Sequence, residues 1–284
     1  MNRRSWSWPI FLMLIMLVVG LTWIIYLSRY QITPSIVDST PQTPDIEVDT
    51  GNPNESKVAA ESHVTITICI DPGHPSETNS GKAIQNGTTE NHINWVISNR
   101  LDERLTSLGY EVVLTKQSEE EYVTNRRRAE IANEVNAALM LRLHSDTGPG
   151  SGFTFYVPDK EGTKDGHTGP PPEVRSAGRQ AAEWLNRYLR DGIGPLKSRG
   201  VLSETHTAVG NKQGALTGSI FARVPVVTME MGFLSNPKDA EFLKSENGQA
   251  QIATVLSEAL DGYLQAILVQ RQLKLKTSEE AETY

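Results

Sequence analysis

Residues 68–74 read Ile-Cys-Ile-Asp-Pro-Gly-His, an apolar run that ends in a tight turn with His74 directly after it. Residues 139–146 read Leu-Met-Leu-Arg-Leu-His-Ser-Asp and place His144 at the end of a second apolar run. Short apolar runs of this kind are typical of strands that are covered on both faces of a sheet. We therefore expect both imidazoles at strand ends, where open α/β sheets gather their ligands.

Strand-like and helical patterns alternate along the rest of the chain. The expected strands are residues 64–70, 110–115, 138–144, 152–157 and 224–231, and the expected helices are residues 90–108, 126–136, 173–191 and 249–268. This alternation predicts a single α/β domain whose sheet is covered by helices on both faces. Residues 158–172 are rich in Pro, Gly and charged residues, which predicts a surface loop.

Two carboxylates accompany the histidines. Glu90 opens the longest of the early helical patterns, and Glu230 closes the apolar run at residues 224–231. A carboxylate at the end of an apolar strand is costly to desolvate unless it is paired or used, which favours a functional role for Glu230. Two imidazoles and one carboxylate are also the ligands of many catalytic zinc ions, with a fourth position left for water. The ligands are far apart in sequence, so spacing alone leaves a structural role open for each histidine.

Taken together, these motifs resemble the zinc-dependent N-acetylmuramoyl-L-alanine amidases of the type-3 amidase family, which hydrolyse peptidoglycan. The resemblance extends from about residue 65 to residue 268. It rests on Asp-Pro-Gly-His (71–74), a Glu at the start of the first helix, Arg-Ala-Glu-Ile-Ala-Asn (128–133), His-Ser-Asp (144–146) and Val-Pro-Val-Val-Thr-Met-Glu-Met-Gly-Phe-Leu-Ser-Asn (224–236). The resemblance implies a mixed sheet of about six strands flanked by helices.

The resemblance also implies a role for each residue of the set. His74, Glu90 and His144 would be the ligands of one Zn²⁺ ion, and Glu230 would be the catalytic carboxylate. The implied reaction is hydrolysis of the amide bond between N-acetylmuramic acid and the first L-alanine of the stem peptide, with peptidoglycan as the partner.

Several positions depart from the family pattern. Pro75-Ser76 follows the first histidine, where the family usually has Gly-Gly. Arg142 stands two residues before the second histidine in place of a serine, and Ser145-Asp146 stands in place of Ala-Asn. These positions leave the ligand set intact, so they bear on substrate preference rather than on the metal.

Two further residues are candidates for substrate contacts. Asp146 could orient a ligand or contact the substrate, and a role in stabilising a turn is equally compatible with its position. His206 could contact the peptide, and the alternative is a loop histidine without a role.

The N-terminal part of the chain predicts a membrane anchor. Residues 9–27 (PIFLMLIMLVVGLTWIIYL) carry no charge and have about the length that spans a bilayer core. Arg3 and Arg4 precede this run, so the excess of positive charge places residues 1–8 in the cytoplasm and the following chain outside. A cleaved signal peptide is the alternative, although residues 28–31 offer no clear cleavage site.

The remaining boundaries follow from composition. Residues 28–62 are rich in Pro, Thr, Ser and acidic residues, which predicts a flexible linker. Residues 63–270 form the expected catalytic domain, and residues 271–284 a charged, frayed tail. The expected location is the bacterial cytoplasmic membrane, crossed once, with the catalytic domain outside the cytoplasm.

Charge and cysteine content restrict the function further. The formal net charge of −7 argues against nucleic acid as a partner, because such binding needs clustered Lys and Arg. Cys69 is the single cysteine, so it cannot form an internal disulfide, and its apolar surroundings predict a buried, inert thiol.

Two other functions are compatible with the sequence. One is a catalytically weak or inactive amidase homologue that acts as a wall-binding or regulatory module, and the other is a zinc carboxypeptidase that acts on wall peptides. The four residues of the set are all present, which favours the amidase. A protein activator, the oligomeric state and the biological process are left open.

Overall fold

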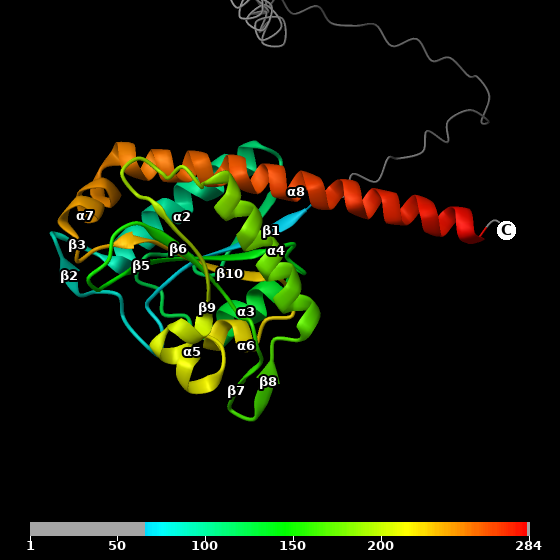
Figure 1. Ribbon diagram of the computed structural model, residues 1–284, viewed down its shortest axis with the longest axis horizontal. Coiled ribbons are helices and arrows are strands. Elements are labelled where there is room, and N and C mark those ends of the chain that lie inside the picture. The colour runs from blue at the N-terminus through cyan, green and yellow to red at the C-terminus, as the bar shows by residue number, and fades with distance from the viewer. Residues whose placement is uncertain (1–65, 283–284) are drawn as a thin grey trace, which may run out of the picture. The chain divides into compact units, whose positions relative to one another are not determined.

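The computed structural model describes residues 66–282 (Figure 1). The expected anchor at residues 9–27 and the expected linker at residues 28–62 lie outside the described residues.

A six-stranded mixed sheet forms the centre of the described domain (Figure 1). In spatial order its strands are β4 (Glu111–Leu114), β1 (Thr67–Pro72), β5 (Met140–Asp146), β10 (Val226–Phe233), β6 (Phe153–Val157) and β9 (Ser198–Ser203). The first four run parallel to one another, whereas β6 is antiparallel to β10 and parallel to β9. The α/β fold with a mixed sheet of six strands is therefore confirmed.

The helices cover the two faces of this sheet unequally. One face carries α2 (Glu90–Ser107) and α4 (Pro172–Tyr188), and α8 (Glu246–Glu282) packs against both of these helices. The other face carries α3 (Asn125–Glu134), which packs against β1 and against the short helix α6 (Thr217–Ile220). The second face is the less completely covered one, and its uncovered part holds the candidate site.

Alternation of side chains along the strands decides which residues reach that face. Every second strand residue points into the main core beneath α2, α4 and α8, namely Ile68, Ile70, Leu139, Leu141, Leu143, Val227, Met229 and Met231. The residues between them point to the other face, where Cys69, Met140 and Val226 form a smaller apolar cluster. Because the period of a strand is two residues, Asp71, Arg142, His144, Thr228 and Glu230 must lie on this same face, closer to the carboxyl ends of the strands.

Smaller elements surround the sheet. They are the hairpins β2 (Ile84–Gln85) with β3 (Thr88–Thr89) and β7 (Gly162–Lys164) with β8 (His167–Gly169), and the helices η1 (Glu204–His206), α5 (Ala208–Gln213) and α7 (Pro237–Lys244). The segment 158–172, expected as an irregular loop, thus contains a short hairpin. Helix α8 continues through Glu282, whereas the sequence predicted a helix end at Leu268 and a frayed tail after residue 270.

Helix α8 is also the one helix among the described residues that is long and apolar enough to cross a membrane, over Glu246–Gln270. Its apolar residues Ile252, Leu256, Leu260 and Leu264 are fully buried in the main core. Packing against α2 and α4 therefore accounts for the apolar character of this helix within the domain.

Candidate functional site

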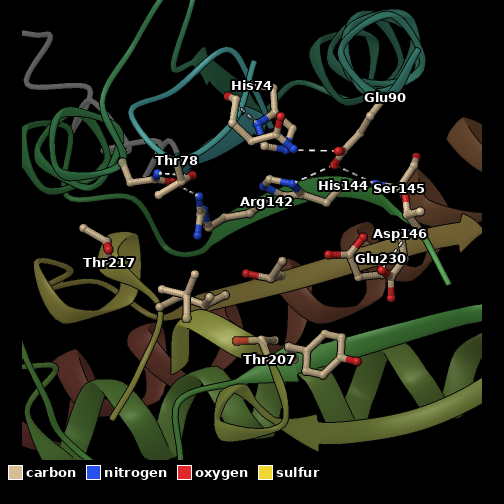
Figure 2. Close-up of a pocket in the computed structure, with 17 residues that line it drawn as sticks. His74, Thr78, Glu90, Arg142, His144, Ser145, Asp146, Thr207, Thr217 and Glu230 are labelled. Atoms are coloured by element: carbon tan, nitrogen blue, oxygen red, sulfur yellow. Dashed lines mark hydrogen bonds and ion pairs between the residues drawn. The ribbon is translucent and has the colours of Figure 1, made fainter. Parts of the chain in front are cut away.

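Three side chains from separate elements converge at the carboxyl end of the parallel strands (Figure 2). His74 follows β1, Glu90 is the first residue of α2, and His144 lies on β5. Nε2 of His74 lies 3.1 Å from Oε2 of Glu90, and Nδ1 of His144 lies 3.1 Å from Oε1 of the same carboxylate. One ligand atom from each residue lies within 4.8 Å of the others, so the three could share one metal ion.

The orientation of His74 and the pKa values of His144 and Glu90 suit metal binding. Nδ1 of His74 lies 3.0 Å from the carbonyl oxygen of Asn79, a contact that fixes the orientation of the ring. Burial lowers the pKa of His144 to about 4, so its ring is neutral at physiological pH. Burial alone would raise the pKa of Glu90, but hydrogen bonds with His144 and His74 hold it well below its usual range. The neutral imidazole of His144 thus faces an ionised carboxylate.

Two glycines allow the imidazoles to approach the chain so closely. A Cβ atom on Gly73 would lie 2.4 Å from the ring of His144, and a Cβ atom on Gly81 would lie 2.6 Å from Cβ of His74. His74 itself has a φ of 65°, in the left-handed region that a non-glycine residue rarely adopts. The ammonium group of Lys116 donates to the carbonyl oxygen of His74 and to Oδ1 of Asn91, which fixes this turn against α2. The local backbone therefore leaves space for the two rings and fixes the turn that carries His74.

Glu90 is held from both of its sides. The side chain of Thr89 caps α2 by accepting from the backbone amide of His92, which begins the helix at Glu90. The backbone amide of Ser145 donates to Oε1 of Glu90 over 3.2 Å. Helix α2 and strand β5 therefore fix the carboxylate jointly.

Glu230 lies on β10 beside His144, its direct partner in the strand register. Its Oε2 atom is buried and has no hydrogen-bond partner among the described residues. Burial raises the pKa of Glu230 well above its usual value, and the negative charges of Glu90 and Asp146 raise it further. A buried carboxylate oxygen without a protein partner costs free energy, which indicates that the position serves chemistry rather than stability.

A buried ion cluster lies beneath these residues. Arg128 donates from Nη1 to Oδ1 of Asp71 over 2.6 Å, and Arg142 donates from Nε to Oδ2 over 2.8 Å. Burial alone would raise the pKa of Asp71, but the two guanidinium groups more than offset burial and hold this pKa well below its usual range. Arg128 also donates to the carbonyl oxygens of Pro72 and Pro75, so the cluster fixes the turn that carries His74.

The converging side chains line a cavity of about 360 Å³. Beyond the three candidate ligands and Glu230, its lining includes residues that the sequence patterns did not single out, among them Thr78, Asn79, Asn125, Tyr156, Thr207, Val209, Leu216, Thr217 and Thr228. One wall comes from the segment 204–220, which is held by the fully buried Glu204. Its carboxylate accepts from the backbone amide of Leu216 over 2.8 Å and from the hydroxyl of Ser219. No local pattern marked this segment, because its contribution depends on the packing of short helices.

The two weaker candidates lie in different places. Asp146 lines the cavity, and its Oδ1 accepts from the backbone amide of Thr147 over 2.7 Å, which stabilises the turn after β5. His206 is exposed and is absent from the cavity lining, and its Nδ1 lies 3.1 Å from the carbonyl oxygen of Ser203. The neighbouring Thr207 lines the cavity instead.

Known proteins are similar to this chain in sequence and in fold. The family profile described as "Amidase_3: N-acetylmuramoyl-L-alanine amidase" matches residues 68–262. The chain belongs to this family. The match includes β1 to β10 apart from the first residue of β1, and it therefore contains all residues that converge on the cavity.

Individual relatives agree with this family. The chain is 24% identical over 221 residues to the N-acetylmuramoyl-L-alanine amidase Rv3717 of Mycobacterium tuberculosis, covering 70% of this chain and 86% of that protein. It shares the fold of the amidase AmiC2 of Nostoc punctiforme (TM-score 0.56, 23% identity, 70% and 97% of the two chains). It also shares the fold of the catalytic domain of the amidase CwlV of Bacillus (Paenibacillus) polymyxa var. colistinus (TM-score 0.57, 21% identity, 71% and 99%).

Proposed function

We propose that this protein is a zinc-dependent N-acetylmuramoyl-L-alanine amidase that hydrolyses the amide bond between N-acetylmuramic acid and L-alanine in peptidoglycan. The observation that carries the proposal is the convergence of His74, Glu90 and His144 beside the unpartnered carboxylate oxygen of Glu230. Membership of the amidase family supplies the substrate class.

The donor set fits zinc. Zn²⁺ favours imidazole nitrogen and carboxylate oxygen, and its catalytic sites combine three protein ligands with one open position. Here the imidazole of His74 is oriented by the carbonyl oxygen of Asn79, outside the centre, and the carboxylate is held by a backbone amide. When bound, such an ion would polarise the scissile carbonyl group and lower the pKa of water.

Glu230 would carry the proton transfers. Glu230 lines the same cavity as the proposed ligands, and its Oε2 atom has no hydrogen-bond partner among the described residues that would compete for a proton. The carboxylate would take a proton from the attacking water and pass it to the nitrogen of L-alanine as the amide bond breaks. The raised pKa of this carboxyl group suits the step in which it gives the proton up.

The N-terminal segment would place this reaction at the wall. We propose that residues 9–27 anchor the chain in the cytoplasmic membrane and that residues 28–62 are a tether, with the domain outside the cytoplasm. The domain's net acidity offers no basis for nucleic-acid binding.

Analysis of the products tests the proposed reaction. Purified peptidoglycan is incubated with the full-length protein and zinc, and the soluble products are identified by mass spectrometry and by labelling of new amino groups. An amidase produces stem peptides with a free amino-terminal alanine and leaves the glycan strands uncut. Release of a carboxy-terminal residue would instead indicate a carboxypeptidase, and binding without any product would indicate an inactive wall-binding module.

A further inference from the structure

Arg142 places a guanidinium group in the cavity lining, two residues before His144 on the same face of β5. The side chain is only 3% exposed, and two of its three nitrogens have protein partners. Nε donates to Asp71, and Nη2 donates to Oδ1 of Asn125 over 2.7 Å. Nη1 has no hydrogen-bond partner among the described residues. An ionised guanidinium with an unused N–H group at a cavity wall is a site for an anion.

The charges around Arg142 leave it able to attract such an anion. Asp71 is the carboxylate bonded to it, but Asp71 is shared with Arg128, so two guanidinium groups face one carboxylate. The oxygens of Glu204 are engaged by Leu216 and Ser219 rather than by Arg142. The buried cluster therefore carries a net positive charge at the cavity.

Charge is consequently distributed unevenly along the cavity (Figure 2). Arg142 lies with the hydroxyl groups of Thr78 and Thr217 toward one end, whereas Asp146 and Glu230 lie toward the other. An anionic group of a substrate would be repelled from the acidic end and attracted to the guanidinium end. This asymmetry can determine the direction in which an extended substrate binds.

The chemistry of the proposed substrate identifies the anion. In the scissile amide the lactyl carboxyl group of N-acetylmuramic acid is already consumed, so the nearest carboxylate must come from the peptide. Two residues along a strand span roughly 7 Å, and two residues of extended peptide span about the same length. If the scissile amide lies at His144, the second residue of the peptide can therefore reach Arg142. In the stem peptide this residue is a γ-linked D-glutamate, whose α-carboxylate is free.

We propose that Arg142 binds the free α-carboxylate of the peptide residue that follows L-alanine, and thereby selects the stem peptide and fixes its direction in the cavity. This inference rests on the proposed amidase function. It makes Arg142 a specificity-determining residue in addition to its contact with Asp71.

A matched pair of substrates tests the inference without any substitution. The full-length protein with zinc is given N-acetylmuramoyl-L-alanyl-γ-D-glutamyl-L-lysine or the same compound with the α-carboxylate of D-glutamate converted to a carboxamide. Loss of a charge-assisted hydrogen bond should lower kcat/KM for the carboxamide by about 10-fold or more. Equal kcat/KM values for the two compounds would overturn the inference.

Substitutions at Arg142 test whether this residue causes the preference for the carboxylate compound. Arg142→Met should bring the ratio of the two kcat/KM values close to one, whereas Arg142→Lys should keep part of the preference because it keeps the charge. Arg190→Met is the control, because Arg190 is 79% exposed and lies outside the cavity lining, and it should leave the ratio unchanged. An unchanged ratio in folded Arg142→Met would contradict the assignment.

A measurement of binding tests this inference independently of the proposed reaction. Calorimetry with the Glu230→Gln protein measures affinity for the same two compounds without turnover. Tighter binding of the carboxylate compound supports the role of Arg142 even if no hydrolysis is found in the wild-type protein. Equal binding of both compounds, or binding of neither, counts against Arg142, whereas selective binding without hydrolysis counts only against the amidase reaction.

Discussion

Nδ1 of His144 lies 3.1 Å from Oε1 of Glu90, although the two residues are 54 positions apart in the chain. The same carboxylate faces His74 through its other oxygen, so Glu90 is the centre of the ligand set. An ionised carboxylate between two imidazoles is a ready site for a divalent metal ion.

Glu90→Gln should weaken zinc binding by about 10- to 100-fold, because it removes the negative charge while keeping the shape of the side chain. Competition with a chromophoric chelator at neutral pH measures the affinity. Glu173→Gln is the matched control, since Glu173 is also in the first turn of a helix but is exposed. Equal zinc affinity in the two variants would remove Glu90 from the ligand set.

Gly73→Ala should disturb the same centre through packing alone. The new Cβ atom would lie 2.4 Å from the ring of His144, so the ring must move. We expect a fall in zinc affinity of about 10- to 100-fold, comparable to the loss of a group that orients a ligand. Gly262→Ala is the control, because its Cβ atom would meet Trp184 at 3.4 Å, an ordinary contact. Zinc affinity that is the same in both variants would show that His144 tolerates displacement.

Arg128→Met should destabilise the domain by about 3–5 kcal/mol, since it removes the main partner of a fully buried carboxylate. Arg128 is 1% exposed and Asp71 is 0% exposed. The neighbouring Arg127 is 48% exposed and pairs with Glu134 at the surface, so Arg127→Met should cost less than about 1 kcal/mol. Urea unfolding of both variants gives the comparison. The hydroxyl of Thr115 also donates to Oδ1 of Asp71, so similar losses in the two variants would mean that Arg142 and Thr115 hold Asp71 adequately.

Glu204 should make stability depend on pH in a defined window. Burial raises its pKa from an ordinary value of 4.5 to about 7 in the folded protein. The folded state therefore binds a proton more tightly, and the stabilisation from this proton is complete below pH 4.5 and is lost as the pH rises through about 7. The upper limit of this effect is about 3 kcal/mol.

Glu204→Gln should remove that pH dependence. The unfolding free energies of wild type and variant are measured in urea from about pH 4.5 to 8. As the pH rises through this window, the wild-type protein should lose stability relative to the variant. A difference that is flat with pH would show that Glu204 has the same pKa in both states.

Much of the fold and of the candidate site could be predicted from sequence, because buried strands are marked by apolar runs. The runs before His74, His144 and Glu230 identified β1, β5 and β10, and the helical spacing after Glu90 identified α2. Strand β9 was missed, since its sequence Ser-Arg-Gly-Val-Leu-Ser lies at a sheet edge and lacks an apolar run.

The wall of the cavity could not be predicted for a different reason. Residues such as Thr207 and Thr217 reach the cavity only because buried Glu204 ties η1 to α6, and such tertiary contacts have no local pattern. Arg142 was visible in sequence only as a departure from a family pattern. Its contacts with Asp71 and Asn125 emerge from the pairing of β5 with β1 and from the position of α3.

The most direct test of the proposed chemistry compares wild-type protein with Glu230→Gln at equal zinc content. The measured quantity is the rate at which amino-terminal alanine is released from purified peptidoglycan. Because Glu230 would carry the proton transfers and is not one of the three proposed ligands, the variant should hold as much zinc as wild type and release alanine at about one-hundredth of the wild-type rate or less. A folded, zinc-loaded Glu230→Gln protein that releases alanine at the wild-type rate would contradict the assignment.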